Sequence, residues 1–178
     1  MKINLEQIYK ELQAWRDERK ITAESQKDGY IVNAMEELGE LATAVRKYNE
    51  FSKQGGVEKQ TAEHDIINAL CSISIFIVNT EFTINSGLIN KISSFDTDKY
   101  EPSDFDDLHA LLYYISQYPI KWEYIYFKEI LELIAKILEV DYGFNFQIAM
   151  LETIKHISSN TGKEYKAKAD YEKARIKK

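Results

Sequence analysis

Apolar residues recur every three or four positions along most of the chain, which is the spacing of one face of an α-helix. The pattern predicts a first amphipathic helix over residues 3–20 and two longer helices over about 28–50 and 57–80. Gln54-Gly55-Gly56 separates the two long helices, because paired glycines mark turns. Three helices joined in this order predict an up-down-up arrangement.

The second half of the chain continues the helical pattern less regularly. Further helices are predicted over residues 105–117, 122–141 and 145–159. Residues 83–104 are rich in turn-forming residues, and the Lys-rich tail after Lys163 predicts a frayed end or a solvated helix. No stretch shows the alternating pattern of a β-strand. The predicted fold class is therefore all-α, a helical bundle.

Composition narrows the class of protein. The chain has 178 residues, enough for one domain (1–178) with a sizeable core. Its net charge of -6 argues against a nucleic-acid binder. The single cysteine, Cys71, excludes a disulfide framework, and the charged N-terminal residues argue against a signal peptide, so a cytoplasmic location is expected. The most apolar window, residues 66–78, is too short and too polar on one side to span a bilayer, so no membrane is expected.

An acidic cluster lies in the middle of the predicted second helix. Glu36, Glu37 and Glu40 place three carboxylates within five residues. On a helical wheel Glu37 and Glu40 fall within about 60° of each other, with Asn33 between them and Glu36 on the flank. Carboxylates this close repel one another unless a cation lies between them. The cluster therefore predicts one half of a site for a hard cation such as Mg2+, which takes oxygen ligands.

A polar stripe on the predicted third helix supplies a candidate for the other half. Asp65, Asn68, Ser72 and Asn79 fall within about 60° on a wheel. From Ile66 onward the rest of this helix is almost wholly apolar, and a polar stripe on a buried helix is costly unless something pairs with it. An acidic stripe facing a polar stripe predicts a metal site inside a helical bundle.

These two stretches together resemble a known family. Glu36-Glu37-Leu38-Gly39-Glu40 followed by Asp65-Ile66-Ile67-Asn68 is similar to the EExxE and ExxD motifs of the all-alpha NTP pyrophosphohydrolases, the MazG-like superfamily. Residues 149–159, followed by Thr161-Gly162-Lys163, resemble the closing segment of its phage-type branch.

The resemblance covers residues 3–80 and 143–163, and it marks residues 83–142 as an inserted helical segment. It implies cleavage of a nucleoside triphosphate between the α and β phosphates, giving a monophosphate and pyrophosphate, with Mg2+ as cofactor and Mn2+ as an alternative. It also implies a homodimer or homotetramer. The apolar faces of residues 105–141 favour an oligomer as well, because they exceed what a three-helix core can cover.

The resemblance also assigns roles to the acidic residues. Glu37 and Glu40 match the metal ligands of the first motif, and Glu36 matches its leading acid, which we expect to orient or deprotonate the attacking water as the catalytic residue. The second motif is degenerate, because Asp65 replaces a Glu and Asn68 replaces an Asp. Both would complete the metal site, Asn68 as a neutral ligand, so weak Mg2+ binding is expected.

Four further polar residues are expected to contact the substrate: Asn33, Lys47, Ser72 and Asn79. Ser72 stands where many relatives of the resembled family carry another Asp. Lys47 would meet a phosphate, although its position is equally typical of an exposed helix end.

Other interpretations of the same residues stay open. The acidic cluster is also the pattern of a solvated helix face. A degenerate relative would bind nucleotide without turnover, and a helical interaction protein would bind neither nucleotide nor metal. Cys71 fits a small core residue better than a nucleophile, since no histidine lies on its face.

Overall fold

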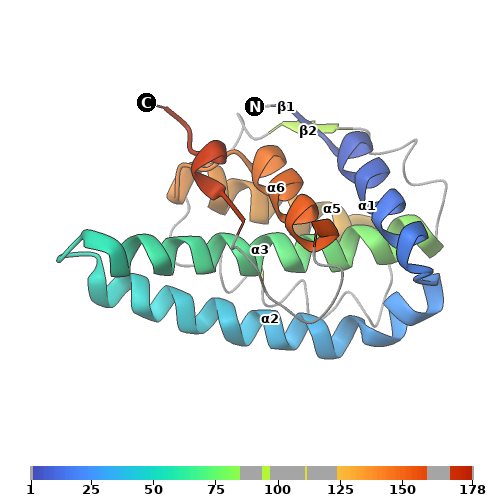
Figure 1. The fold of residues 1–178 in the computed structure, drawn as a ribbon, viewed down its shortest axis with the longest axis horizontal. Coiled ribbons are helices and arrows are strands. Elements are labelled where there is room, and N and C mark those ends of the chain that lie inside the picture. Colours follow the sequence, from blue (N-terminus) through green and yellow to red (C-terminus); the bar gives the residue numbers. More distant parts are fainter. Residues whose placement is uncertain (1, 85–93, 97–110, 112–123, 160–168, 178) are drawn as a thin grey trace.

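The computed structural model describes residues 2–84, 94–96, 111, 124–159 and 169–177, and it confirms the all-α fold class. Figure 1 shows α2 (Ala23–Phe51) alongside α3 (Gly56–Ile84), with α1 (Leu5–Arg19), α5 (Tyr124–Lys136) and α6 (Phe146–Ser159) on the other side of α3. The central position of α3 follows from its sequence, because a helix that is apolar nearly all round must be covered on several sides.

The first three helices match the predicted order, with boundaries set by local capping. The side chain of Asn4 accepts a hydrogen bond from the backbone N–H of Gln7 and so caps the start of α1. Thr22 caps α2 in the same way through the N–H of Ser25. The turn into α3 uses Gly55 and Gly56 at φ of 67° and 87°, a conformation that residues with a Cβ rarely adopt.

A short antiparallel pair of strands departs from the predicted pattern. β1 (Lys2–Asn4) pairs with β2 (Ser94–Asp96), and Ile3 lies opposite Phe95. The prediction that no strand is present, and that the first helix begins at residue 3, was therefore wrong. Strands of three residues are too short to show an alternating pattern.

The segment predicted to be an insertion contributes to the core. Ile130, Ile134 and Leu138 are fully buried, and α5 packs against α3. The predicted helix over residues 122–141 is divided into α5 and a π-helical turn, Ile137–Asp141. The helix predicted over residues 105–117 lies outside the described residues, apart from Leu111.

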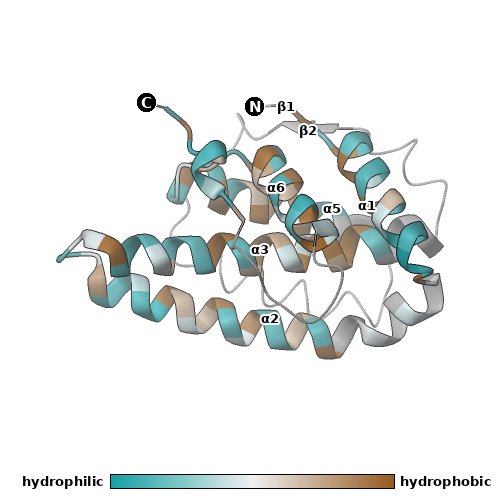
Figure 2. Ribbon diagram, viewed as in Figure 1, coloured by the Kyte–Doolittle hydropathy of each residue, from teal (hydrophilic) through white to brown (hydrophobic). Residues whose placement is uncertain are grey.

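The apolar residues of α3 face the other helices. Ile66, Leu70, Ile73 and Ile77 are fully buried, and Figure 2 shows hydrophobic residues on the stretches of α3 and α6 that lie together. Within the described part of the chain, Gly56–Asn79 is the one helical segment with the length and composition to cross a membrane. At 24 residues it is longer than the apolar window of residues 66–78 that the sequence indicated. In the fold, 61% of the most apolar part of this segment is buried, as is common for the core helix of a bundle.

The C-terminal tail is folded onto the bundle. A 3-10 helix, η2 (Tyr171–Ala174), packs on α6, and its Tyr171 and Ala174 are 2% and 1% exposed. The prediction of a frayed end or solvated helix was wrong for residues 169–177. Two apolar anchors among many lysines are too few to produce a recognisable hydrophobic pattern.

Candidate functional site

The acidic cluster lies at the edge of the interface between α2 and α3. Leu38, Leu41 and Ala44 of α2 are buried in the core, and α2 packs along α3. The helical repeat that buries these residues places Glu37 and Glu40 beside the interface rather than on the far side of α2. The spacing of the apolar residues therefore predicts which face of α2 carries the carboxylates.

A cavity of about 360 Å3 lies between α1, α2, α3 and α6. Its polar lining residues are Glu36, Glu37, Glu40, Asn68, Ser72, Thr153 and His156. Its apolar lining residues are Trp15, Ile75, Phe76 and Ile157. A cavity of this size that combines apolar and polar lining residues is typical of sites for small molecules.

Glu37 is the carboxylate most affected by this environment. Burial is the largest cause that raises its pKa, and the neighbouring charges of Glu40 and Glu36 raise it further, to about 7. A hydrogen bond from Ser72 acts in the opposite direction. One oxygen, Oε2, is buried without a hydrogen-bond partner. Such an oxygen is expected to take a proton or a cation.

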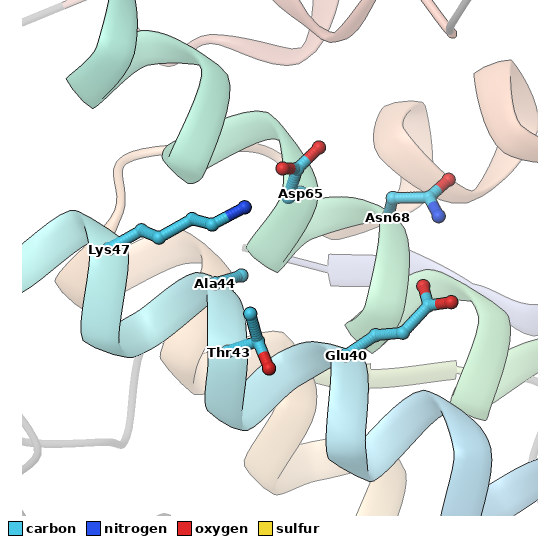
Figure 3. Close-up of a pocket in the computed structure, with 6 residues that line it drawn as sticks. All are labelled: Glu40, Thr43, Ala44, Lys47, Asp65 and Asn68. Atoms are coloured by element: carbon cyan, nitrogen blue, oxygen red, sulfur yellow. The ribbon is translucent and has the colours of Figure 1, made fainter.

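A second cavity of about 270 Å3 adjoins the first. It is lined by Glu40, Thr43, Ala44, Lys47, Asp65 and Asn68. Figure 3 shows Lys47 extended from α2 towards α3, on the side of Asp65. Glu40 and Asn68 line both cavities and therefore mark the boundary between them.

Asn68 is held by the C-terminal segment. The hydroxyl of Tyr171 donates to Asn68 Oδ1 at 3.0 Å, and the same hydroxyl lies 2.9 Å from Thr153 Oγ1. Burial is the main cause that raises the pKa of Tyr171 above its usual range, so the phenol stays protonated. Three elements, α3, α6 and η2, thus meet at the hydroxyl of Tyr171.

Charged contacts fix η2 against α3. Arg175 Nη2 lies 2.8 Å from both Glu63 Oε2 and Glu172 Oε1, and His64 Nε2 lies 3.0 Å from Glu172 Oε1. Hydrogen bonding to Arg175 is the main cause that lowers the pKa of Glu172, to about 2. The guanidinium of Arg175 also stacks over Phe144 at 4.3 Å. These contacts hold the segment that carries Tyr171.

The expected site residues are distributed unevenly. Glu36, Glu37, Glu40, Asn68 and Ser72 line the first cavity, whereas Asp65 and Lys47 line the second. The structure therefore places the two expected halves side by side, with Asp65 on the far side of the boundary from Glu37.

The two expected outer contacts lie elsewhere. The side chain of Asn33 lies close to Gly29, one turn earlier on α2. A methyl group added at Gly29 would be 2.9 Å from Asn33 Nδ2. Asn79 is fully buried further along α3. Neither is among the described residues that line the two cavities. Cys71 is fully buried, and burial raises its pKa to about 12, as expected of a core residue.

The described residues contain no group of three or more His, Cys, Asp or Glu side chains placed to hold a metal ion. A closed metal centre of the expected kind is therefore not preformed in them. Glu37 Oε2 is nevertheless buried without a hydrogen-bond partner, and Glu40 lines the same cavity.

Several residues that line the cavity or contact its lining residues were not predicted from the sequence. Trp15 belongs to α1, Thr153 and His156 belong to α6, and Tyr171 belongs to η2. Each lies far from the acidic motifs in the sequence, so only the packing of the helices brings them to the site. The indole Nε1 of Trp15 is buried without a hydrogen-bond partner, a feature that helical periodicity does not reveal.

Comparisons with known proteins give no match, because no family model, no curated protein and no solved structure is significantly similar to this chain.

Proposed function

We propose that the protein hydrolyses nucleoside triphosphates between the α and β phosphates, with Mg2+ bound beside the phosphates of the substrate. The observation that carries the proposal is the buried oxygen of Glu37, which has no hydrogen-bond partner and lies next to Glu36 and Glu40 in a cavity. A carboxylate in this position favours a cation, and a triphosphate brings the charge and oxygens that hold Mg2+.

The two cavities together suit the shape of a nucleotide. The aromatic lining residues of the first cavity, Trp15 and Phe76, offer apolar contacts to a base, with Arg19 over the Trp15 ring at 5.5 Å. Lys47, in the second cavity, offers a cation to the β and γ phosphates. The α phosphate would then lie at the boundary formed by Glu40 and Asn68, beside the acidic cluster.

The hydrolysis needs a base and control of negative charge. The oxygen of a water molecule forms a bond to the α phosphorus, and the bond from that phosphorus to the bridging oxygen breaks. Pyrophosphate leaves with the electron pair, and Glu36, which lines the cavity, accepts the proton of the water. Glu37 and Glu40 would hold Mg2+, and this ion would supply charge neutralisation at the phosphate.

Pyrophosphate release tests this proposal. A panel of standard and modified nucleoside triphosphates would be assayed with Mg2+ and with Mn2+. We expect turnover by the unchanged protein and a loss of at least about 100-fold in Glu37→Gln and Glu40→Gln. Glu50→Gln is the matched control, because Glu50 is an exposed carboxylate near the end of the same helix. No pyrophosphate from any triphosphate would refute the assignment.

A second candidate function is nucleotide binding without turnover. It is favoured by the lack of a preformed metal group among the described residues and by the uncharged Asn68 in the second motif. Stoichiometric nucleotide binding without pyrophosphate release would select it. The absence of both nucleotide and metal binding would instead select a helical interaction protein.

A further inference from the structure

The orientation of the Asn68 amide decides what this residue offers to a ligand. A side-chain amide carries a carbonyl oxygen on one side and an NH2 group on the other. Tyr171 donates to Oδ1 at 3.0 Å, so the amide nitrogen is turned away from Tyr171. Figure 3 shows this nitrogen on the side of Glu40, at the boundary between the two cavities.

The hydrogens of the network are consistent with this orientation. Thr153 Oγ1 donates to the carbonyl oxygen of Ala149 at 2.9 Å, and it also lies 2.9 Å from the hydroxyl of Tyr171. A phenol has one hydrogen, and Tyr171 uses it for Asn68, so the hydrogen of Thr153 is shared between the Ala149 carbonyl and the Tyr171 oxygen.

Electrostatics favour the same orientation. Figure 3 shows the amide nitrogen of Asn68 on the side of Glu40, a carboxylate that lines both cavities together with Asn68. An amide N–H is stabilised by nearby carboxylates, whereas a carbonyl oxygen pointing at them would be repelled. The hydroxyl of Tyr171 therefore supports the arrangement that the charges prefer.

We infer that Tyr171 is a positioning residue that turns Asn68 so that its N–H groups, and not its carbonyl oxygen, face the ligand. Asn68 then acts as a donor to the phosphate oxygens of a triphosphate and not as a neutral ligand of Mg2+. The inference rests on the proposed function for the choice of ligand, and it changes the role that the family resemblance gave to Asn68.

The first experiment measures binding of inorganic tripolyphosphate by calorimetry to the unchanged protein, to Tyr171→Phe and to Tyr142→Phe. Tyr171→Phe keeps the buried ring and removes only the hydroxyl, so we expect the Kd to rise about two- to tenfold. Tyr142→Phe is the matched control, since Tyr142 is partly buried against Tyr48 and is not among the lining residues. Equal Kd values for Tyr171→Phe and the unchanged protein would overturn the inference.

The second experiment separates the two roles without adding a charge. With Asn68 as a phosphate donor, Asn68→Ala should weaken the binding of tripolyphosphate in the absence of Mg2+ and should leave the affinity for Mg2+ alone unchanged. With Asn68 as a metal ligand, the loss of its oxygen would weaken Mg2+ binding instead. Weaker Mg2+ binding by Asn68→Ala with unchanged tripolyphosphate binding would therefore overturn the inference.

A third measurement uses the unchanged protein, so it can be made even if the substituted proteins fail to fold. The side-chain NH2 signals of Asn68 in an NMR spectrum of the unchanged protein should shift when tripolyphosphate is added. Unshifted signals at saturation would overturn the inference. If the signals shift but no triphosphate is hydrolysed, the proposed function fails while the role of Asn68 stands.

Discussion

Burial gives the Glu37 side chain a structural cost. Burial is the largest cause that raises its pKa to about 7, and the charges of Glu40 and Glu36 raise it further. These surroundings disfavour the ionised carboxylate. In the proposed site, a bound cation would offset this cost.

The raised pKa predicts how stability depends on pH. The pKa of Glu37 is 4.5 in the unfolded chain and about 7 in the folded protein. The contribution of Glu37 to the free energy of unfolding is therefore fully present below pH 4.5 and is lost as the pH rises through about 7. At about pH 8 we expect the free energy of unfolding of Glu37→Gln to exceed that of the unchanged protein by roughly 1–2 kcal/mol, after allowance for solvent screening. The variant should therefore unfold at a higher urea concentration. The difference should shrink at about pH 5.

Urea denaturation at both pH values, with Glu50→Gln as the control, measures this effect. A large loss of stability in Glu37→Gln at both pH values would show instead that the ionised carboxylate makes a stabilising contact. Added Mg2+ should reduce the difference between the two proteins, because a bound cation removes the cost of the charge.

At the scale of elements, η2 connects the end of the chain to the site. Its backbone pairs with the turn before α6, where Asn145 N donates to Ala174 O and Ile176 N donates to Gly143 O, both at 2.7 Å. Its side chains reach α3 through Arg175 and the hydroxyl of Tyr171. A short segment of this kind is stable only because it covers an existing core.

Removal of residues 169–178 should therefore destabilise the bundle. The deletion takes away the buried ring of Tyr171 and uncovers Phe144, which Arg175 covers. We expect the free energy of unfolding to fall by roughly 3 kcal/mol or more, measured by urea denaturation. Deletion of residues 177–178 alone is the control, because Lys177 is exposed. An unchanged midpoint for the longer deletion would show that η2 does not pack in solution.

At the scale of the whole molecule, the outer side of α2 is the surface that the described fold leaves uncovered. α2 packs along α3, and Figure 1 shows it at one side of the bundle. Val32 and Met35 are 69% and 62% exposed on this helix. Two large apolar side chains one turn apart on an outer helix favour burial against a second copy of the chain.

We therefore expect a homodimer that uses the outer face of α2. Light scattering at about 10 micromolar should give twice the mass of the chain, and Met35→Glu should shift the protein towards the monomer. Val57→Glu is the matched control, because Val57 is 73% exposed in the first turn of α3. A monomeric mass for the unchanged protein would contradict this prediction.

The helices, and the face of each that carries polar groups, follow from local spacing along the chain. The 3.6-residue repeat puts Glu37 and Glu40 on one face of α2 and Asn68 and Ser72 on one face of α3, and the packing of α2 along α3 brings the two faces to one cavity. The same repeat put Leu41 and Ile73 in the core. These are local properties, and local spacing is sufficient to predict them.

The completion and division of the site depend on the packing of the helices. Trp15, Thr153 and Tyr171 come from separate elements, and no spacing within one helix can bring them to the site. The separation of Asp65 from Glu37 depends on the register in which α2 packs along α3, since Asp65 shares a cavity with Lys47 and Glu37 shares the other with Ser72. The direction of the Asn68 amide depends on a hydroxyl 103 residues further along the chain, because a hydrogen bond is decided by position in space.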